Sequence, residues 1–200
     1  MSAWSRTGID RLLLSAFAGG ALIGSYAAAF QISLVLFTLG RIFRTAWEPR
    51  MLRALADHDP ASLLQLTRLF LLLWLIVAAL ACAVAVAAEP ICRLMLGSDY
   101  PDSPQLLYWA VIGQAFLAMK VADVQVMHAR RTAILGWISL LTTLLHLVLG
   151  YLALRHWGVV ALVQVSALTF LLGFMLTQLA GQICAPLPYG AAVGIRRCRS

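Results

Sequence analysis

Long uninterrupted runs of apolar residues dominate the chain and give the first indication of its fold. No charged residue occurs in the 29 positions from Leu12 to Gly40. A helix rises about 1.5 Å per residue and the hydrocarbon core of a bilayer is about 30 Å thick, so this run is too long for one upright crossing. Because glycines near position 20 offer a break, we predict a partial helix over 9–18 and a full span over 21–43.

Four further apolar runs follow, and each is long enough to cross a bilayer. They predict spans over 69–88, 104–127, 132–154 and 157–183. Inside lipid the backbone must pair within its own segment, and runs this long without alternation are helices rather than strands. The sequence therefore predicts an all-α membrane protein, a polytopic helix bundle of five full transmembrane helices plus a short N-terminal helical segment. The bundle forms one domain over 1–185, and a basic tail follows over 186–200.

Composition supports the membrane interpretation. The chain is 62% hydrophobic and only 12% charged, with a mean hydropathy of +0.88, whereas soluble domains carry about 25% charged residues. The net charge of +7 raises the alternative of nucleic-acid binding. The basic residues lie in short segments between apolar runs, however, so no nucleic-acid partner is expected.

No pattern of catalytic residues is evident. The four cysteines form no CxxC pair and no metal-ligand spacing with the four histidines. There is no HExxH motif, no phosphate-binding glycine loop and no Ser–His–Asp arrangement. We expect no enzyme activity, no metal and no cofactor.

The start of the chain has a second interpretation. Arg6 and Arg11 precede an apolar stretch, and Ala27-Ala28-Ala29 resembles a signal-peptidase site. The run stays apolar beyond that site as far as Gly40, which favours a first span over a cleaved signal.

The distribution of basic residues predicts the orientation. Ten of them lie between the first and second spans, between the third and fourth, and in the tail, while only four lie in the alternate segments. This alternation predicts a cytoplasmic C-terminus.

One charged pair lies inside a predicted span. Lys120 and Asp123 are three residues apart and share a helix face. Lys120 lies about 24 Å along the third span if that helix starts near Pro104. Two interpretations remain: a charge that lines a water-filled cavity, or a snorkelling lysine with a local salt bridge.

Three spans carry polar or small residues on one side. In the fourth span these are Thr132, Gly136, Ser139, Thr143, His146 and Gly150. Such a face either packs against another helix or lines a polar path, and His146 either carries a proton or is simply hydrogen-bonded. The first span has Gly24, Gln31, Thr38 and Thr45 at heptad spacing with Arg41 beside them, and the fifth has Gln164, Gln178 and Gln182.

A short basic cluster marks the cytoplasmic end of the first span. Arg41, Arg44 and Glu48 lie along one side and precede Pro49, which we expect to kink or end the helix. Arginine forks suit phosphate oxygens, so the cluster is either a site for an anionic headgroup or ordinary positive-inside anchoring.

The order of several short motifs resembles a known family over nearly the whole chain, to about residue 183. The motifs are Asp10-Arg11, Gly24-Ser25-Tyr26-Ala27, Trp47-Glu48-Pro49, Leu96-Gly97-Ser98-Asp99-Tyr100 and Trp157-Gly158-Val159-Val160-Ala161. Together they are similar to the C-terminal half of polysaccharide (O-antigen type) flippases, in the multidrug/oligosaccharidyl-lipid/polysaccharide exporter superfamily. The family often has asparagine where His146 and Gly150 stand.

This resemblance implies a function. Family members move undecaprenyl-diphosphate-linked oligosaccharide across the bacterial inner membrane by alternating access, through a cavity between two lobes. The chain would then be a C-terminal lobe, truncated or paired with an N-terminal lobe or second chain, in contact with membrane lipids. Substrate-path candidates are Arg41, Arg44, Lys120, Asp123, Gln31 and His146, and structural candidates are Asp10, Arg11, Gly24, Tyr26, Pro49, Gly97, Tyr100 and Gly158. The alternatives are a non-transporting scaffold or remnant, and half of a drug or cation exporter.

Overall fold

The fold is given by a computed structural model that describes residues 2–17, 19–96, 100 and 102–192. Over these residues the chain forms nine helices and no strand. Their bounds are α1 Ser2–Phe17, α2 Gly20–Ala56, α3 Pro60–Val86, α4 Ala88–Leu96, α5 Ser103–Ala118, α6 Asp123–His128, α7 Thr132–Trp157, α8 Val159–Cys184 and α9 Tyr189–Ala192.

Five helical segments are long and apolar enough to cross a membrane, which confirms the predicted fold class. They are Leu22–Ala56, Pro60–Val86, Ser103–His128, Thr132–Trp157 and Val159–Cys184. Large apolar side chains remain exposed along them, for example Leu75 at 68% and Leu179 at 61%. In a polytopic helix bundle such side chains face lipid, so the chain is a multi-pass membrane protein.

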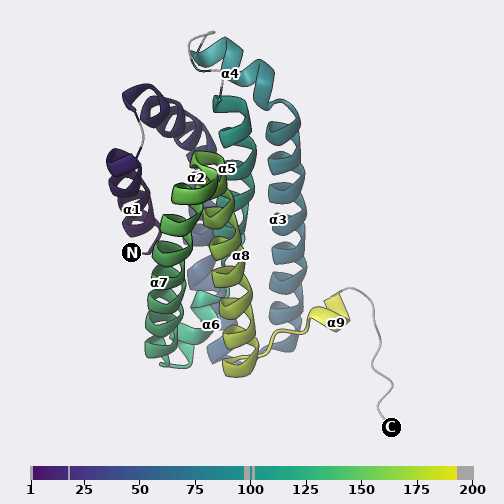
Figure 1. The fold of residues 1–200 in the computed structure, drawn as a ribbon. Coiled ribbons are helices and arrows are strands. Elements are labelled where there is room, and N and C mark those ends of the chain that lie inside the picture. Colours follow the sequence, from purple (N-terminus) through teal and green to yellow (C-terminus); the bar gives the residue numbers. More distant parts are fainter. Residues whose placement is uncertain (1, 18, 97–99, 101, 193–200) are drawn as a thin grey trace.

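Helix α5 lies at the centre of the bundle (Figure 1). It packs against α2, α3 and α8, while α7 pairs with α8 and α1 lies against α7. In the most apolar stretch of the span Ser103–His128, 67% of the residues are buried, whereas in that of the span Thr132–Trp157 only 17% are buried. The main core joins these helices through Leu107, Val111 and Leu162, all of which are fully or almost fully buried.

The first two helices differ from the sequence prediction. Helix α1 starts at Ser2 rather than near residue 9, and α2 continues through Pro49 to Ala56. Of the two outcomes expected at Pro49, a kink or an end, the helix does not end there. The extension is held by tertiary packing, because Met51, Ala54 and Leu55 are buried in a second core with α3.

The third predicted span is interrupted. Instead of one helix over 104–127, α5 ends at Ala118 and α6 starts at Asp123. In the break, the Met119 carbonyl accepts a hydrogen bond from the Val121 backbone N–H at 3.0 Å and a second one from Trp74 Nε1 of α3, also at 3.0 Å. Buried backbone carbonyls need such partners, so the contact from α3 adds to the local turn.

Helices α2 and α5 approach closely near the same break. A Cβ atom added at Gly40 would lie 2.6 Å from the Ala118 Cα atom. Only a residue without a side chain permits this approach, which brings the following turns of α2 beside α6.

Candidate functional site: a buried Asp–His–Tyr network

Asp10 is a carboxylate buried among transmembrane helices. It lies in α1 and is only 2% exposed. Leu14 follows four residues later on the same helical face and is fully buried. This face of α1 packs against α7, so the carboxylate is directed into the protein rather than toward lipid.

Polar side chains from three other helices lie around this carboxylate. Tyr26 Oη of α2 donates to Asp10 Oδ2 at 2.7 Å, and Ser166 Oγ of α8 lies 3.4 Å from the same oxygen. His146 Nε2 of α7 lies 2.7 Å from Asp10 Oδ1. A buried carboxylate is tolerated only when its oxygens are paired in this way, so Asp10 joins α1 to α2, α7 and α8.

His146 is the second ionisable group of the network, and its side chain is completely buried. Its other ring nitrogen, Nδ1, lies 3.3 Å from Thr169 Oγ1. The Thr169 hydroxyl is also 3.0 Å from the Ser166 carbonyl oxygen, to which it donates. It can therefore accept from a protonated Nδ1 while donating to that carbonyl, or rotate and donate to an unprotonated Nδ1.

This arrangement provides for two protonation states of His146. The ring orientation and the heavy-atom positions suit both the neutral imidazole and the imidazolium, because the Thr169 hydroxyl changes its role.

A glycine on α7 allows the helices to meet here. Gly150 lies one turn from His146, and an added Cβ atom would lie 3.0 Å from Leu162 Cδ1 and 3.6 Å from Leu13 Cδ1. Gly150 therefore lets α1 and α8 converge beside the imidazole.

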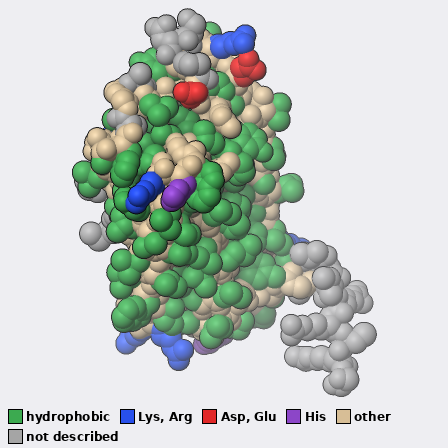
Figure 2. All heavy atoms as spheres, viewed as in Figure 1, with side chains coloured by type: hydrophobic (Ala, Val, Ile, Leu, Met, Phe, Trp, Pro, Cys, Tyr) green, Lys and Arg blue, Asp and Glu red, His purple; other side chains and the backbone are tan. Residues whose placement is uncertain are grey.

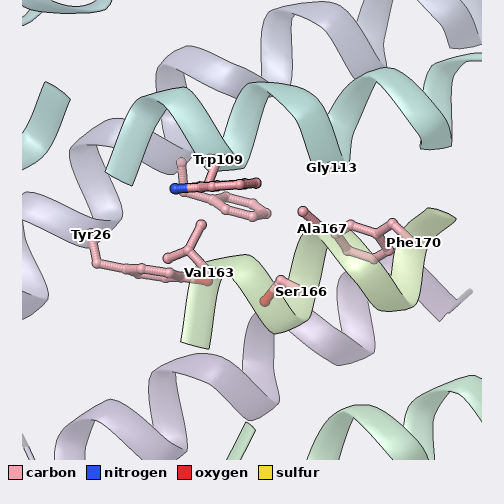
Figure 3. Close-up of a pocket in the computed structure, with 9 residues that line it drawn as sticks. Tyr26, Trp109, Gly113, Val163, Ser166, Ala167 and Phe170 are labelled. Atoms are coloured by element: carbon pink, nitrogen blue, oxygen red, sulfur yellow. The ribbon is translucent and has the colours of Figure 1, made fainter. Parts of the chain in front are cut away.

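A small cavity adjoins the network. It is lined by residues of α2, α5 and α8, including Tyr26 and Ser166, which both contact Asp10. Figure 3 shows the Tyr26 ring beside Val163, with Trp109 on the other side of Val163. The enclosed space suits about one water molecule.

The network lies deep in the bundle. Gly158 lies at the turn between α7 and α8. His146 lies 12 residues before Gly158, and Thr169 lies 11 residues after Gly158. At about 1.5 Å per residue both lie about 17 Å from the turn, near the middle of a core about 30 Å thick. Ionisable side chains at such depth are costly and typically belong to substrate or ion pathways.

A second polar cluster links α2 and α6. Arg44 Nη1 lies 2.9 Å from Asp123 Oδ2 and donates to it, while Lys120 Nζ lies 3.7 Å from Asp123 Oδ1. Glu48 Oε2 lies 3.6 Å from Arg44 Nε. The predicted local salt bridge between Lys120 and Asp123 is confirmed, although Lys120 lies in the break between helices rather than on one.

Other residues singled out in the sequence lie apart from both clusters. Gln31 and Arg41 are exposed on α2, and Arg11 is exposed on α1. The polar face of α7 is buried at one end and exposed at the other. His146 and Gly150 are buried, while Thr132 and Gly136 are exposed. Its inner part thus packs against other helices.

Gly24 and Gly158 of the sequence motifs each have a structural role. Tyr100 packs against Gly24, where an added Cβ atom would lie 3.2 Å from Tyr100 Cε1. Gly158 has a φ of +82° between α7 and α8, a conformation that favours glycine. Gly97 lies outside the described residues.

Sequence reasoning did not single out Ser166 and Thr169. With Gly173 and Thr177 they form a buried face of α8 at helical spacing. That pattern of small and hydroxyl residues was present in the sequence, but the more polar glutamines of the same helix obscured it.

Comparison with protein-family models, with curated proteins and with solved structures finds no match to this chain.

Proposed function

We propose that this chain is one lobe of an ion-coupled membrane transporter. The observation that carries the proposal is the Asp10–His146 pair at 2.7 Å, with both side chains buried near the middle of the helix bundle. A simple membrane anchor has no use for such a pair, whereas transporters use buried carboxylates and histidines to bind coupling ions.

We infer the substrate class from the family resemblance of the motifs. It favours a lipid-linked oligosaccharide of the undecaprenyl diphosphate type, exported for surface polysaccharide synthesis. Two of the residues in those motifs, Asp10 and Tyr26, contact each other across 16 residues of sequence. Arg41 is exposed on α2 beside the polar Gln31–Thr45 face, where a second lobe or chain would complete a cavity.

We also propose residence in the bacterial inner membrane with a cytoplasmic C-terminus. Arg44, Arg50 and Arg53 lie at one end of α2, and Arg130 and Arg131 lie beside the start of α7, as the positive-inside rule expects for a cytoplasmic side. Alkaline phosphatase fused after Asp57 should be inactive, and the same enzyme fused after Trp157 should be active. The reverse pattern would contradict this orientation.

Deletion and complementation in the bacterial host test the transport role. Deletion should reduce surface polysaccharide and raise the lipid-linked precursor in the cytoplasmic leaflet, and the wild-type gene should restore both. Asp10→Asn should fail to restore them although the protein is present at normal level, because the carboxylate that binds the coupling ion is lost. Glu89→Gln, which removes an exposed carboxylate paired with Arg93, is the matched control and should restore export.

Other results would favour the alternative functions. Normal surface polysaccharide after deletion would contradict export of this substrate. Altered drug susceptibility with intact polysaccharide would favour a drug or cation exporter. Full restoration by Asp10→Asn would instead favour a scaffold that needs no ion site.

A further inference from the structure

Helix α2 presents one continuous stripe of exposed side chains to the outside of the bundle. Its members recur at alternating steps of four and three residues, and they are Gln31, Val35, Thr38, Ile42, Thr45 and Pro49. An average repeat of about 3.5 residues keeps such side chains on one side of a helix, and it is the spacing by which two parallel helices pack along a seam. The stripe therefore has the pattern of a helix–helix interface, although it is exposed in the single chain.

Gln31 gives this stripe a polar group deep in the membrane. It lies 11 residues after Gly20, where α2 begins, and 10 residues before Arg41, which belongs to the basic end of the helix. At about 1.5 Å per residue these separations are about 17 Å and 15 Å, so the amide lies well inside a hydrocarbon core about 30 Å thick. Among the described residues the other exposed glutamines, Gln65 and Gln105, lie within the first two turns of their helices. Gln31 is thus the exposed glutamine that requires a partner within the membrane.

The polar groups of the stripe are not satisfied within the chain. Among the residues that the structure describes, no hydrogen bond reaches the Gln31 amide or the Thr38 hydroxyl, which lies seven residues further along α2. Lipid tails offer no partner, whereas amide and hydroxyl side chains in membranes bond to the polar side chains of another helix. Figure 2 shows a contrasting face over α7 and α8, where hydrophobic side chains cover most of the surface. Lipid suits that face, while the α2 stripe requires a protein partner.

The stripe is suited to pair with a second copy of itself. Two copies that follow the same positive-inside signal insert in the same orientation, so their α2 helices can run parallel about a two-fold axis along the membrane normal. In such a dimer each stripe residue faces its own counterpart. A glutamine amide both donates and accepts, so two Gln31 side chains satisfy each other. None of the stripe residues is charged, so this pairing brings no like charges together.

We propose that two copies of this chain form a parallel dimer along the α2 stripe, with the two Gln31 amides hydrogen-bonded to each other across the axis. Val35 and Ile42, which are 59% and 62% exposed in the single chain, pack between the polar positions of the seam. The stripe lies on the face where a second lobe would complete the proposed transporter, so the inference rests on that function only in naming the lobe as a second copy. Formation of the dimer requires neither ion binding nor export.

Energy transfer between donor-labelled and acceptor-labelled copies of the full chain in liposomes tests the proposal. Transfer should fall as the protein is diluted with lipid, and an excess of unlabelled wild-type chain should abolish it. Gln31→Leu should lower the association constant about tenfold, because it removes the amide pair from each dimer. Gln31→Asn keeps a donor and an acceptor at the same position, so it should lower the association constant less than Gln31→Leu does.

Gln65→Leu is the matched control, because it makes the same change at an exposed glutamine of α3 outside the stripe, and it should leave association unchanged. On oxidation, Thr38→Cys should form more disulfide-linked dimer than the wild-type chain, whereas Leu144→Cys, at an exposed position of α7, should not. A monomeric wild-type chain at every dilution, an equal loss in Gln65→Leu, no loss in Gln31→Leu, or equal crosslinking of Leu144→Cys would each overturn the proposal. Export that requires a different co-expressed chain, with the wild-type chain monomeric, would contradict the dimer alone. A dimer whose deletion leaves surface polysaccharide unchanged would contradict only the transport role.

Discussion

The Asp10–His146 pair should contribute to stability in a way that only a double substitution reveals. His146→Leu removes the partner at 2.7 Å and leaves Asp10, 2% exposed, with the Tyr26 hydroxyl as its close donor. Removing a hydrogen-bond partner from a buried charged group costs up to about 3 kcal/mol, since the carboxylate stays buried with one partner fewer. That corresponds to about a hundredfold change in the unfolding equilibrium constant.

Removing both members should be less harmful than removing one. Asp10→Leu with His146→Leu leaves no buried charge, and the main remaining defect is Tyr26 Oη without its acceptor. An unpaired buried hydroxyl costs about 1–2 kcal/mol. We therefore expect the double variant to be more stable than His146→Leu alone, and adding Tyr26→Phe should recover part of the residual loss.

Free energies of unfolding can be measured by titrating the protein in mixed micelles with sodium dodecyl sulfate, followed by circular dichroism. The double-mutant cycle then gives the coupling between the two positions. A double variant whose loss equals the sum of the single losses would refute the reasoning, because independent sites behave in that way. So would a His146→Leu loss under about 0.6 kcal/mol, the average for an ordinary hydrogen bond between transmembrane helices.

Three further substitutions test other parts of the structure. Gly40→Ala places a Cβ atom 2.6 Å from Ala118 Cα and should lower the free energy of unfolding by about 1–3 kcal/mol; Gly136→Ala has no atom within 4 Å of the new Cβ, and a similar loss there would contradict the packing argument. Asp123→Asn should cost about 1 kcal/mol, discounted because Arg44 is 29% exposed, and the same loss in an Arg44→Gln background would show that the pair is not coupled. Hydrogen bonds lower the pKa of the Asp59 carboxyl, the largest effect coming from the Ser62 hydroxyl and the next from the Ala61 amide. The stabilisation by the ionised Asp59 should therefore be present above about pH 3.9 and be lost as pH falls through the lower pKa of the folded state. In a pH titration of stability, Asp59→Asn should remove this acid loss, while Asp57→Asn should retain it.

The helices could be predicted because span length follows directly from bilayer thickness. Runs of apolar residues fix where five helices cross, and the structure has five such segments. The break after Ala118 could not be predicted, since the residues 119–122 contain neither glycine nor proline. A tertiary contact accompanies it, because Trp74, which lies 45 residues earlier, donates to the Met119 carbonyl beside the local bond from Val121. The continuation of α2 through Pro49 is likewise a consequence of packing on α3.

For the buried network, the sequence indicated the residues but not their contacts. Asp10, Tyr26 and His146 each stood out in the sequence, yet no local pattern indicates that they meet. Asp10 and His146 are 136 residues apart, and Asp10 and Ser166 are 156 apart. Periodicity reports which face of a helix a residue occupies, but not which helix covers that face. The convergence depends on α1 lying against α7, which only the tertiary structure provides.

Helix α2 connects the two polar clusters. It carries Tyr26, which contacts Asp10, and Arg44, which pairs with Asp123. The two residues are 18 positions apart, or about 27 Å along one continuous helix. Between them, Gly40 fits against Ala118 so closely that α2 cannot slide along α5 without a clash. Helix α2 thus joins the membrane-embedded network to the basic end of the bundle through one continuous helix, which is packed closely on α5 between the two contacts.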